Sequence, residues 1–280
     1  MKLARTKKDL AKHLGVSRAS LYYKPKRALN DLKTKDLITK VMSEHKSYGH
    51  KRIAIELKMN RKKILRVMKK FDLKPYRRRI KRPTKPEDLG KAPAIYQNLI
   101  KNIIADRPNL IWAADFTYIK FMGKFIYLAT IIDLFTREII GFAISKNHDH
   151  FMCLDALNMA IIKTKTMPKY HHCDQGSEYD SKDYIGRLNE NEIMISMSKK
   201  GSPWENGFQE SFYSQFKLDL GYVNRFEDLG ELIEAIYLAI YEYNTDRIHT
   251  SMKMSPAQFK DQFNKQMNNN INLIYADKSV

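Results

Sequence analysis

The chain has 280 residues, enough for two domains, and no stretch of it approaches the roughly 20 consecutive apolar residues that would cross a membrane. It has only two cysteines, Cys153 and Cys173, too few for a framework of disulfide bonds. Its first residues lack the apolar run of a secretory signal. We therefore expect a cytoplasmic protein without a membrane partner. Its 50 Lys and Arg against 31 Asp and Glu leave a net charge of +19, which excludes an acidic chain and favours a polyanionic partner.

The positive charge is confined to the N-terminal third. Residues 1–90 hold 29 basic and 8 acidic side chains, a net charge of +21, whereas residues 91–280 hold 21 and 23, a net charge of −2. Such asymmetry is expected where one part of a chain neutralises nucleic acid and another part has a different task. A solvated, highly charged face is the alternative interpretation.

Residues 1–30 are predicted to be a helix-turn-helix segment. Residues 7–23 read as a short helix, a glycine turn and a second helix capped by Ser17. The second helix would present Arg18, Ser20 and Tyr22 to a major groove. Plain packing of three helices produces the same pattern, so the pattern alone leaves DNA contact open.

Residues 31–73 are predicted to be a second helical DNA-binding module, with helices near 34–45, 50–58 and 60–71. The last helix follows an Asn60 cap and buries an apolar side, leaving most of its basic side chains outward. Those expected to contact DNA are Arg61, Lys62 and Arg66.

A basic linker is predicted over residues 74–107. Its first part is rich in Arg, Lys and Pro and has no apolar periodicity, which is typical of an extended connection between domains. We expect Arg77, Arg78 and Arg79 to follow DNA phosphates.

From residue 108 the composition changes to β-branched and aromatic runs that predict strands. Three strands come first, then a helix near 149–165, a strand at 169–174, a helix near 181–190, a short strand and a long helix from about 205. This order is that of an α/β ribonuclease-H-like fold, a mixed five-stranded sheet flanked by helices. It is predicted for residues 108–262, with a frayed tail at 263–280.

Three acidic residues are the candidate catalytic groups. Asp115 lies within an apolar strand, where a carboxylate is costly unless a metal or a partner compensates it, although a structural salt bridge would do so too. Asp174 ends another apolar strand and opens the turn DQGSEY, where a capping role is common. Glu210 lies in a helix, and most helical glutamates are simply solvated.

The helical wheel around Glu210 predicts its orientation. Phe208, Phe212 and Phe216 share one side of the helix and are expected to bury it. The opposite side, which would face the site, is expected to carry Asn206, Glu210, Tyr213, Ser214 and Lys217.

The predicted fold would bring the three carboxylates together, because adjacent central strands and a facing helix carry them. Hard oxygen ligands suit Mg²⁺ or Mn²⁺, and phosphodiester transfer uses two such ions roughly 4 Å apart. One ion activates the attacking water or 3'-hydroxyl and the other stabilises the leaving oxygen. A zinc site at His171, His172 and Cys173 is disfavoured, since consecutive strand residues alternate faces.

The loop at 196–207 also has features of a DNA contact. Glycine, serine and proline surround Trp204, which could stack on an unpaired base or anchor the loop on the core. Lys199 and Lys200 are expected to meet phosphates, with an ordinary solvated pair as the alternative.

The chain resembles the second-reading-frame (OrfB-like) transposases of bacterial insertion sequences, the IS-three family, within the DDE transposase and retroviral integrase superfamily. The resemblance runs through most of the chain, in SYGHKRI at 47–53, PNLIWAADFTYI at 108–119, IIDLFTREIIG at 131–141, HCDQGSEY at 172–179, SKKGSPWENGFQESFYSQFK at 198–217 and YNTDRIHTSMKMSP at 243–256. It implies that Asp115, Asp174 and Glu210 are the catalytic, metal-binding triad and that Lys217 is directed at transposon-end DNA. Gln175, Glu178 and the run at 205–207 depart from the usual pattern, which puts end-sequence preference in doubt.

The resemblance also implies a function. The enzyme would bind the terminal inverted repeats of its element as double-stranded DNA, nick at the 3' end with magnesium, and join that end to target DNA, so that DNA recombination and integration follow. At least a dimer on DNA is implied, with an upstream-frame fusion or partner as a further implication, in a bacterial cytoplasm at the nucleoid. A ribonuclease-H-like nuclease and an inactive DNA-binding remnant are the alternatives.

Overall fold

The computed structural model describes residues 6–22, 26–77, 96–199 and 202–276. The chain divides into two compact units, Met1–Tyr76 and Arg77–Val280. The predicted Arg78 and Arg79 of the linker and Lys200 of the loop lie outside the described residues.

The N-terminal unit is helical. Its elements are α1 (Lys7–His13), the 3-10 helix η1 (Arg18–Tyr22), α2 (Lys26–Glu44), α3 (His50–Glu56) and α4 (Arg61–Lys70). The helices α2, α3 and α4 share a small core in which Ile38, Ile53 and Ile64 are fully buried. Asn60 caps α4 as predicted, because its side-chain oxygen accepts a hydrogen bond from the backbone N–H of Lys62 at 2.8 Å.

The second helix predicted after Ser17 is only a five-residue 3-10 turn. The Ser17 hydroxyl accepts from the N–H of Ser20 and also contacts the Ser20 hydroxyl at 2.8 Å, a local bonding pattern that competes with a regular α-helix. The next helix, α2, begins at Lys26 and crosses the predicted boundary between residues 30 and 31.

The larger unit contains one mixed sheet of five strands. These are β1 (Ile111–Phe121), β2 (Lys124–Asp133), β3 (Ile139–Ser145), β4 (Tyr170–Cys173) and β5 (Met194–Met197). Their order in the sheet is β3-β2-β1-β4-β5, with β1, β2 and β3 antiparallel and β1, β4 and β5 parallel. The predicted ribonuclease-H-like mixed sheet is therefore confirmed.

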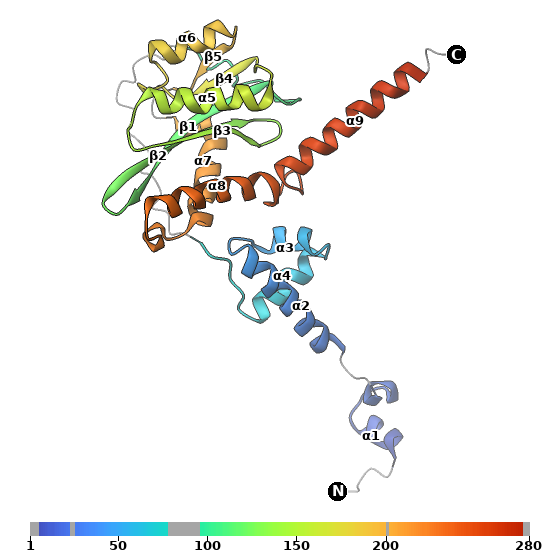
Figure 1. The fold of residues 1–280 in the computed structure, drawn as a ribbon. Helices are drawn as coiled ribbons and strands as arrows, with labels where there is room; N and C mark the ends of the chain where they lie inside the picture. Colours follow the sequence, from blue (N-terminus) through green and yellow to red (C-terminus); the bar gives the residue numbers. More distant parts are fainter. Residues whose placement is uncertain (1–5, 23–25, 78–95, 200–201, 277–280) are drawn as a thin grey trace. The chain divides into compact units, whose positions relative to one another are not determined.

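Helices cover both faces of this sheet (Figure 1). On one face α5 (His150–Thr164) and α6 (Lys182–Glu190) pack over a cluster that includes Trp112 and Ala114. On the other face α7 (Gly207–Leu220), which follows the 3-10 helix η2 (Pro203–Asn206), and α8 (Leu229–Thr245) pack over Ile111 and Ala113; the short η3 (Val223–Arg225) joins them. Neighbouring β1 residues thus face opposite layers, as the strand period requires.

Gly141 lets α5 approach β3 closely. A Cβ atom at this position would lie 2.2 Å from the carbonyl oxygen of Ala156, so no larger residue fits without displacing the helix. The glycine of the IIDLFTREIIG segment therefore has a packing reason.

The last helix, α9 (Pro256–Ala276), extends through most of the tail that was expected to be frayed. Its first turns are attached to the core by the Lys260 ammonium, which donates to the buried Glu138 carboxylate at 2.9 Å. Phe259 and Phe263 pack on Phe135. Within the described part of the chain, no helix is both long and apolar enough to cross a membrane.

Candidate active site

The pairing of β1 with β4 brings Asp115 and Asp174 together. The parallel register pairs Trp112 with His171 and Ala113 with His172. Two residues further along each strand are Asp115, within β1, and Asp174, directly after β4. The two aspartates are consequently carried side by side by hydrogen-bonded neighbours.

Burial and the charges of nearby carboxylates disfavour the charged forms of these aspartates. Burial raises the pKa of Asp115 to about 7, and the charge of Asp174 and then that of Glu210 add to the rise. The N–H of Phe116, which donates to the Asp115 carboxylate at 2.8 Å, and the charge of Lys217 oppose it. Burial also raises the pKa of Asp174, against a hydrogen bond from the Gly176 N–H at 3.0 Å. A positive charge placed here would be strongly stabilised.

Helix α7 is fastened to the strand that carries Asp115. The Tyr213 hydroxyl donates to the backbone oxygen of Asp115 at 2.6 Å. The Gln209 side-chain amide donates to the backbone oxygens of Ala113 at 2.6 Å and Thr130 at 3.0 Å. The Asn206 amide donates to the Ala114 oxygen at 3.0 Å. Four side-chain bonds thus fix the start of α7 around the candidate catalytic aspartate.

The faces of α7 differ from the helical wheel. Phe212 and Phe216 are buried as predicted, but Phe208 is 46% exposed and its ring lies 3.6 Å from the Arg137 guanidinium carbon. Asn206 and Tyr213, expected on the outer side, are buried. The wheel was wrong for these three residues because the sheet offers carbonyl acceptors to the polar ones.

Glu210 lies in the first turn of α7 and is exposed. Its charge raises the pKa of Asp115, so it interacts electrostatically with that aspartate. Among the described residues, however, no group of three or more His, Cys, Asp or Glu side chains is arranged so that it could hold a metal ion. The structure thus brings the two aspartates together, but Glu210 does not complete a set of three metal ligands with them.

A pair between the buried Glu178 and the exposed His148 was not predicted as part of the site. The Glu178 carboxylate is 7% exposed and lies 2.9 Å from the His148 imidazole, and its charge contributes to the raised pKa of Asp174. The His148 ring packs against Phe116 and Tyr127. The only signal in the sequence was that Glu178 departs from the usual family pattern.

His171 and His172 are structural residues on opposite sides of β4. The Tyr184 hydroxyl lies 2.8 Å from the His171 imidazole, and the Ser196 hydroxyl lies 2.9 Å from that of His172. Burial lowers the pKa of His171 to about 3 and that of His172 to about 4, so both are neutral at pH 7. These partners agree with the expectation that the two imidazoles do not share a zinc ion.

Comparison with known proteins supplies the family. Two models described as integrase core domain match residues 105–203 and 191–256. An uncharacterized 31 kDa protein of insertion element IS600 from Shigella sonnei is 30% identical over 270 residues, covering 90% of this chain and 97% of that protein. The transposase InsF for insertion sequence IS3fB from Escherichia coli (strain K12) is 33% identical over 173 residues, 60% of each chain. The chain belongs to the IS-three family of insertion-sequence transposases.

The transposase is therefore an integrase-core enzyme of the DDE polynucleotidyl transferase class, as the resemblance implied. Among solved structures it is similar to the HTLV-2 integrase catalytic core domain in complex with magnesium. The match has 20% sequence identity and a TM-score of 0.46, and it covers 55% of the transposase and 97% of that chain.

The predicted DNA-contact residues of the transposase are mostly on the surface. Arg18, Ser20 and Tyr22 are exposed in η1, where the Lys7 ammonium lies 4.6 Å from the Tyr22 ring centre. Arg61, Lys62 and Arg77 are also exposed. Their role in DNA binding stays a prediction.

Arg66 does not point freely outward as predicted. Its guanidinium donates to both carboxylate oxygens of Asp31, at 2.5 and 2.7 Å, and Lys70 donates to the same carboxylate at 2.9 Å. Asp31 is buried on α2, 35 residues away in sequence, so the periodicity of α4 could not reveal it. In the transposase Arg66 holds α4 against α2.

The contact of Lys199, Trp204 and Lys217 with DNA also stays a prediction. Lys199 is exposed, with its backbone N–H donating to the Glu205 carboxylate at 2.9 Å, and Trp204 is 67% exposed. The Lys217 ammonium of the transposase lies 5.2 Å from the Tyr118 ring centre and lowers the pKa of Asp115. Lys217 is thus electrostatically coupled to the aspartate pair.

Proposed function

We propose that this transposase binds the terminal inverted repeats of its insertion sequence and catalyses 3'-end nicking and strand transfer at Asp115, Asp174 and Glu210. The observation that carries the proposal is the placement of Asp115 beside Asp174 on paired parallel strands, with a raised pKa on both. A site in which two carboxylates are costly to ionise would be stabilised by a bound cation.

The donor chemistry fits Mg²⁺ or Mn²⁺. Asp115 and Asp174 supply hard oxygen ligands from neighbouring strands, and Glu210 in the first turn of α7 would be the third ligand. Two bound ions would supply activation of the attacking oxygen and stabilisation of the leaving one. The exposed Glu210 side chain would have to move toward the pair to complete the ligand set, and the hydrogen bonds between α7 and β1 would hold the helix in place.

The residues around the triad have supporting roles. Tyr213 and Gln209 hold the backbone on which Asp115 stands, which keeps the carboxylate oriented during turnover. Lys217 offsets part of the negative charge and is exposed enough to meet a phosphate of the transposon end. The contact between the Glu178 carboxylate and the His148 imidazole would stabilise the loop that follows Asp174.

Sequence-specific binding is assigned to the basic N-terminal unit. Its exposed Arg18, Arg61 and Lys62 would neutralise phosphates of the terminal repeats while the larger unit cuts and joins. The exposed Arg77, the first residue of the larger unit, would contact phosphates as well. Synapsis of two ends requires at least a dimer on DNA, and target DNA is the second nucleic-acid partner. An upstream-frame product is a further candidate partner.

The experiment that tests this proposal compares Asp174→Asn with Asp180→Asn, a matched change at an exposed aspartate six residues further on. The purified chain is incubated with Mg²⁺, a pre-cleaved end duplex and plasmid, and joined products are mapped. Asp174→Asn should lose strand transfer by at least about a thousandfold, while gel-shift binding of the end stays within about twofold.

Asp180→Asn should keep both activities. Equal strand transfer by Asp174→Asn and Asp180→Asn would overturn the assignment of the site. Cleavage of an RNA–DNA hybrid without joining of transposon ends would favour the ribonuclease-H-like nuclease instead, and metal-independent end binding without any nicking would favour an inactive remnant.

A further inference from the structure

A cavity opens on the α7 face of the larger unit. It has a volume of about 530 Å³ and lies between the segment that precedes β1, the turn joining β2 to β3, and the start of α7. Sites that hold small ligands typically measure about 300–1,000 Å³. The cavity is therefore large enough for one nucleobase with part of its sugar.

The turn between β2 and β3 places Arg137 in the lining of this cavity. The Asp133 carboxylate accepts hydrogen bonds from the backbone N–H groups of Asn109, Phe135 and Thr136, at 2.6, 3.0 and 2.7 Å, so the turn is firmly shaped. Arg137 follows with a left-handed backbone and lines the cavity. Among the described residues its buried Nη1 has no hydrogen-bond partner, a costly condition for a guanidinium.

Two aromatic side chains stand at the same cavity with much of their surface in water. Trp204 is 67% exposed and Phe208 is 46% exposed, and both belong to its lining. Phe208 also stacks on the Arg137 guanidinium, with 3.6 Å between the ring centre and Cζ. Exposed rings beside a cationic plane form the kind of platform on which unpaired bases stack.

A carboxylate in the lining discriminates between ligand classes. Glu205 accepts hydrogen bonds from the Asn98 side-chain amide at 3.1 Å and the Lys199 N–H at 2.9 Å, so it is held in place at the cavity. Its negative charge opposes a phosphate but suits the amino or imino donors of a base. Arg137 in turn supplies donors for ring nitrogen or carbonyl acceptors.

We propose that this cavity, defined by Arg137, Trp204, Glu205 and Phe208, receives a single unpaired nucleobase, with guanine preferred. Guanine carries the O6 and N7 acceptors that arginine matches, together with the N–H donors that a carboxylate accepts. The inference rests on the proposed end binding and names a strand position at which the transposase holds a base out of the stack.

The cavity is well placed for a base near the reacting phosphate. Ile111, which lines it, lies four residues before Asp115 and on the same face of β1, a separation of about 13 Å. That distance corresponds to roughly four nucleotides of B-form rise. A base extruded here would anchor the strand while a nucleotide roughly four positions away is held at the aspartates.

Tryptophan fluorescence tests the proposal directly. The chain has two tryptophans, and Trp112 is fully buried whereas Trp204 is exposed, so ligand-dependent changes report on the cavity. The probes are single-stranded pentamers with abasic sugars at four positions and G, A, C or T at the centre, plus an all-abasic pentamer. We expect the G probe to quench Trp204 at the lowest concentration and the abasic probe not to quench it.

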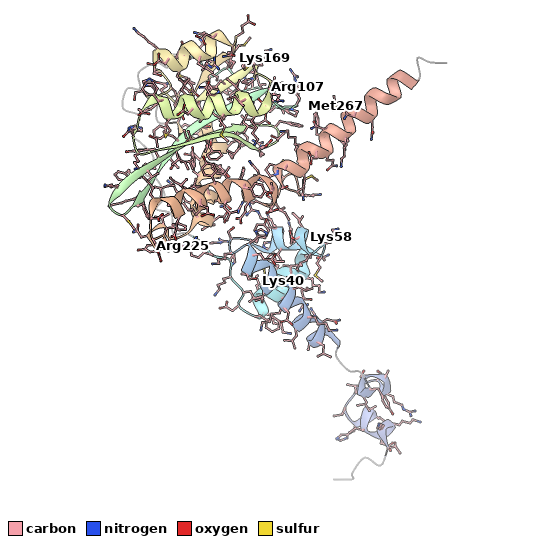
Figure 2. The ribbon with its side chains drawn as sticks, in the orientation of Figure 1. Lys40, Lys58, Arg107, Lys169, Arg225 and Met267 are labelled. Atoms are coloured by element: carbon pink, nitrogen blue, oxygen red, sulfur yellow. The ribbon has the colours of Figure 1, made fainter. Side chains whose placement is uncertain are left out.

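Arg137→Met is the informative variant and Arg107→Met its matched control. Arg107, labelled in Figure 2, is 61% exposed, lies before β1 and is not one of the residues that line the cavity. Arg137→Met should weaken the G probe about tenfold and remove the preference for G, the effect expected of one lost charged hydrogen bond. Arg107→Met should change neither.

Quenching by the abasic probe equal to that by the G probe, or an equal loss in Arg107→Met, would overturn the proposal. The comparison of probes on the unaltered protein stands even where a variant misfolds. Asp174→Asn should keep the quenching while losing strand transfer, so failure of the cavity and failure of the proposed catalytic site give different results.

Discussion

Asp115→Asn is expected to stabilise the larger unit while abolishing its chemistry. Burial and the charge of Asp174 raise the pKa of Asp115 from 3.8 to about 7. Between these values the folded chain keeps a proton that the unfolded chain has released, so this group's contribution to stability falls as the pH rises. The resulting decrease in the free energy of unfolding starts near pH 3.8 and is complete above pH 7, where it amounts to about 4 kcal/mol.

Asparagine cannot ionise and is therefore free of this penalty. Urea unfolding followed by the fluorescence of the buried Trp112 should show the variant more stable than the unaltered chain at pH 8 in the presence of EDTA. The difference should shrink by about 3 kcal/mol between pH 8 and pH 5. Asp155→Asn, at an exposed position of α5, should show no such dependence.

The reasoning is refuted by a variant that is less stable at pH 8, or by a stability difference that does not change with pH. Adding Mg²⁺ at pH 8 should stabilise the unaltered chain more than Asp115→Asn, because binding to the folded state alone raises stability by mass action. An equal gain in both would show that Asp115 does not hold the ion.

Two further predictions follow from hydrogen bonds of the described residues. Tyr213→Phe should destabilise the larger unit by about 1–2 kcal/mol, because the hydroxyl bonded to the Asp115 oxygen is lost. The variant should also slow strand transfer on a pre-cleaved end without weakening the binding of that end in a gel shift. Unchanged rates would show that this hydrogen bond does not orient the aspartate. Arg66→Met should lower the melting temperature of the N-terminal unit by several degrees, measured by circular dichroism, whereas Lys62→Met should not. The reverse order would mean that the buried Asp31 does not need the Arg66 guanidinium.

The strands and the carboxylate pair could be predicted because their signals are local. Runs of β-branched and aromatic residues predicted all five strands, and two acids at corresponding points of neighbouring strands must meet once those strands pair. Periodicity reports which residues share a side of a helix, but not which side the rest of the fold will bury. Tyr213 and Phe208 therefore exchanged their expected environments.

Contacts between distant segments were beyond the reach of pattern alone. Arg66 is paired with Asp31 and Glu178 with His148, and each pair joins residues about thirty or more positions apart whose meeting depends on tertiary packing. The buried Arg137 Nη1, which has no hydrogen-bond partner among the described residues, could not be predicted either, because its burial depends on the packing of the β2–β3 turn beside the start of α7. The catalytic role of the triad itself stays a prediction until the variants are measured.

The parallel pairing of β1 with β4 has a consequence for how activity arises during biosynthesis. The two aspartates become neighbours only after the hairpins, α5 and the intervening turns have closed a long loop, and such non-local pairing is a slow step in folding. In a chain that has been synthesised only as far as β3, the two aspartates are therefore not yet neighbours.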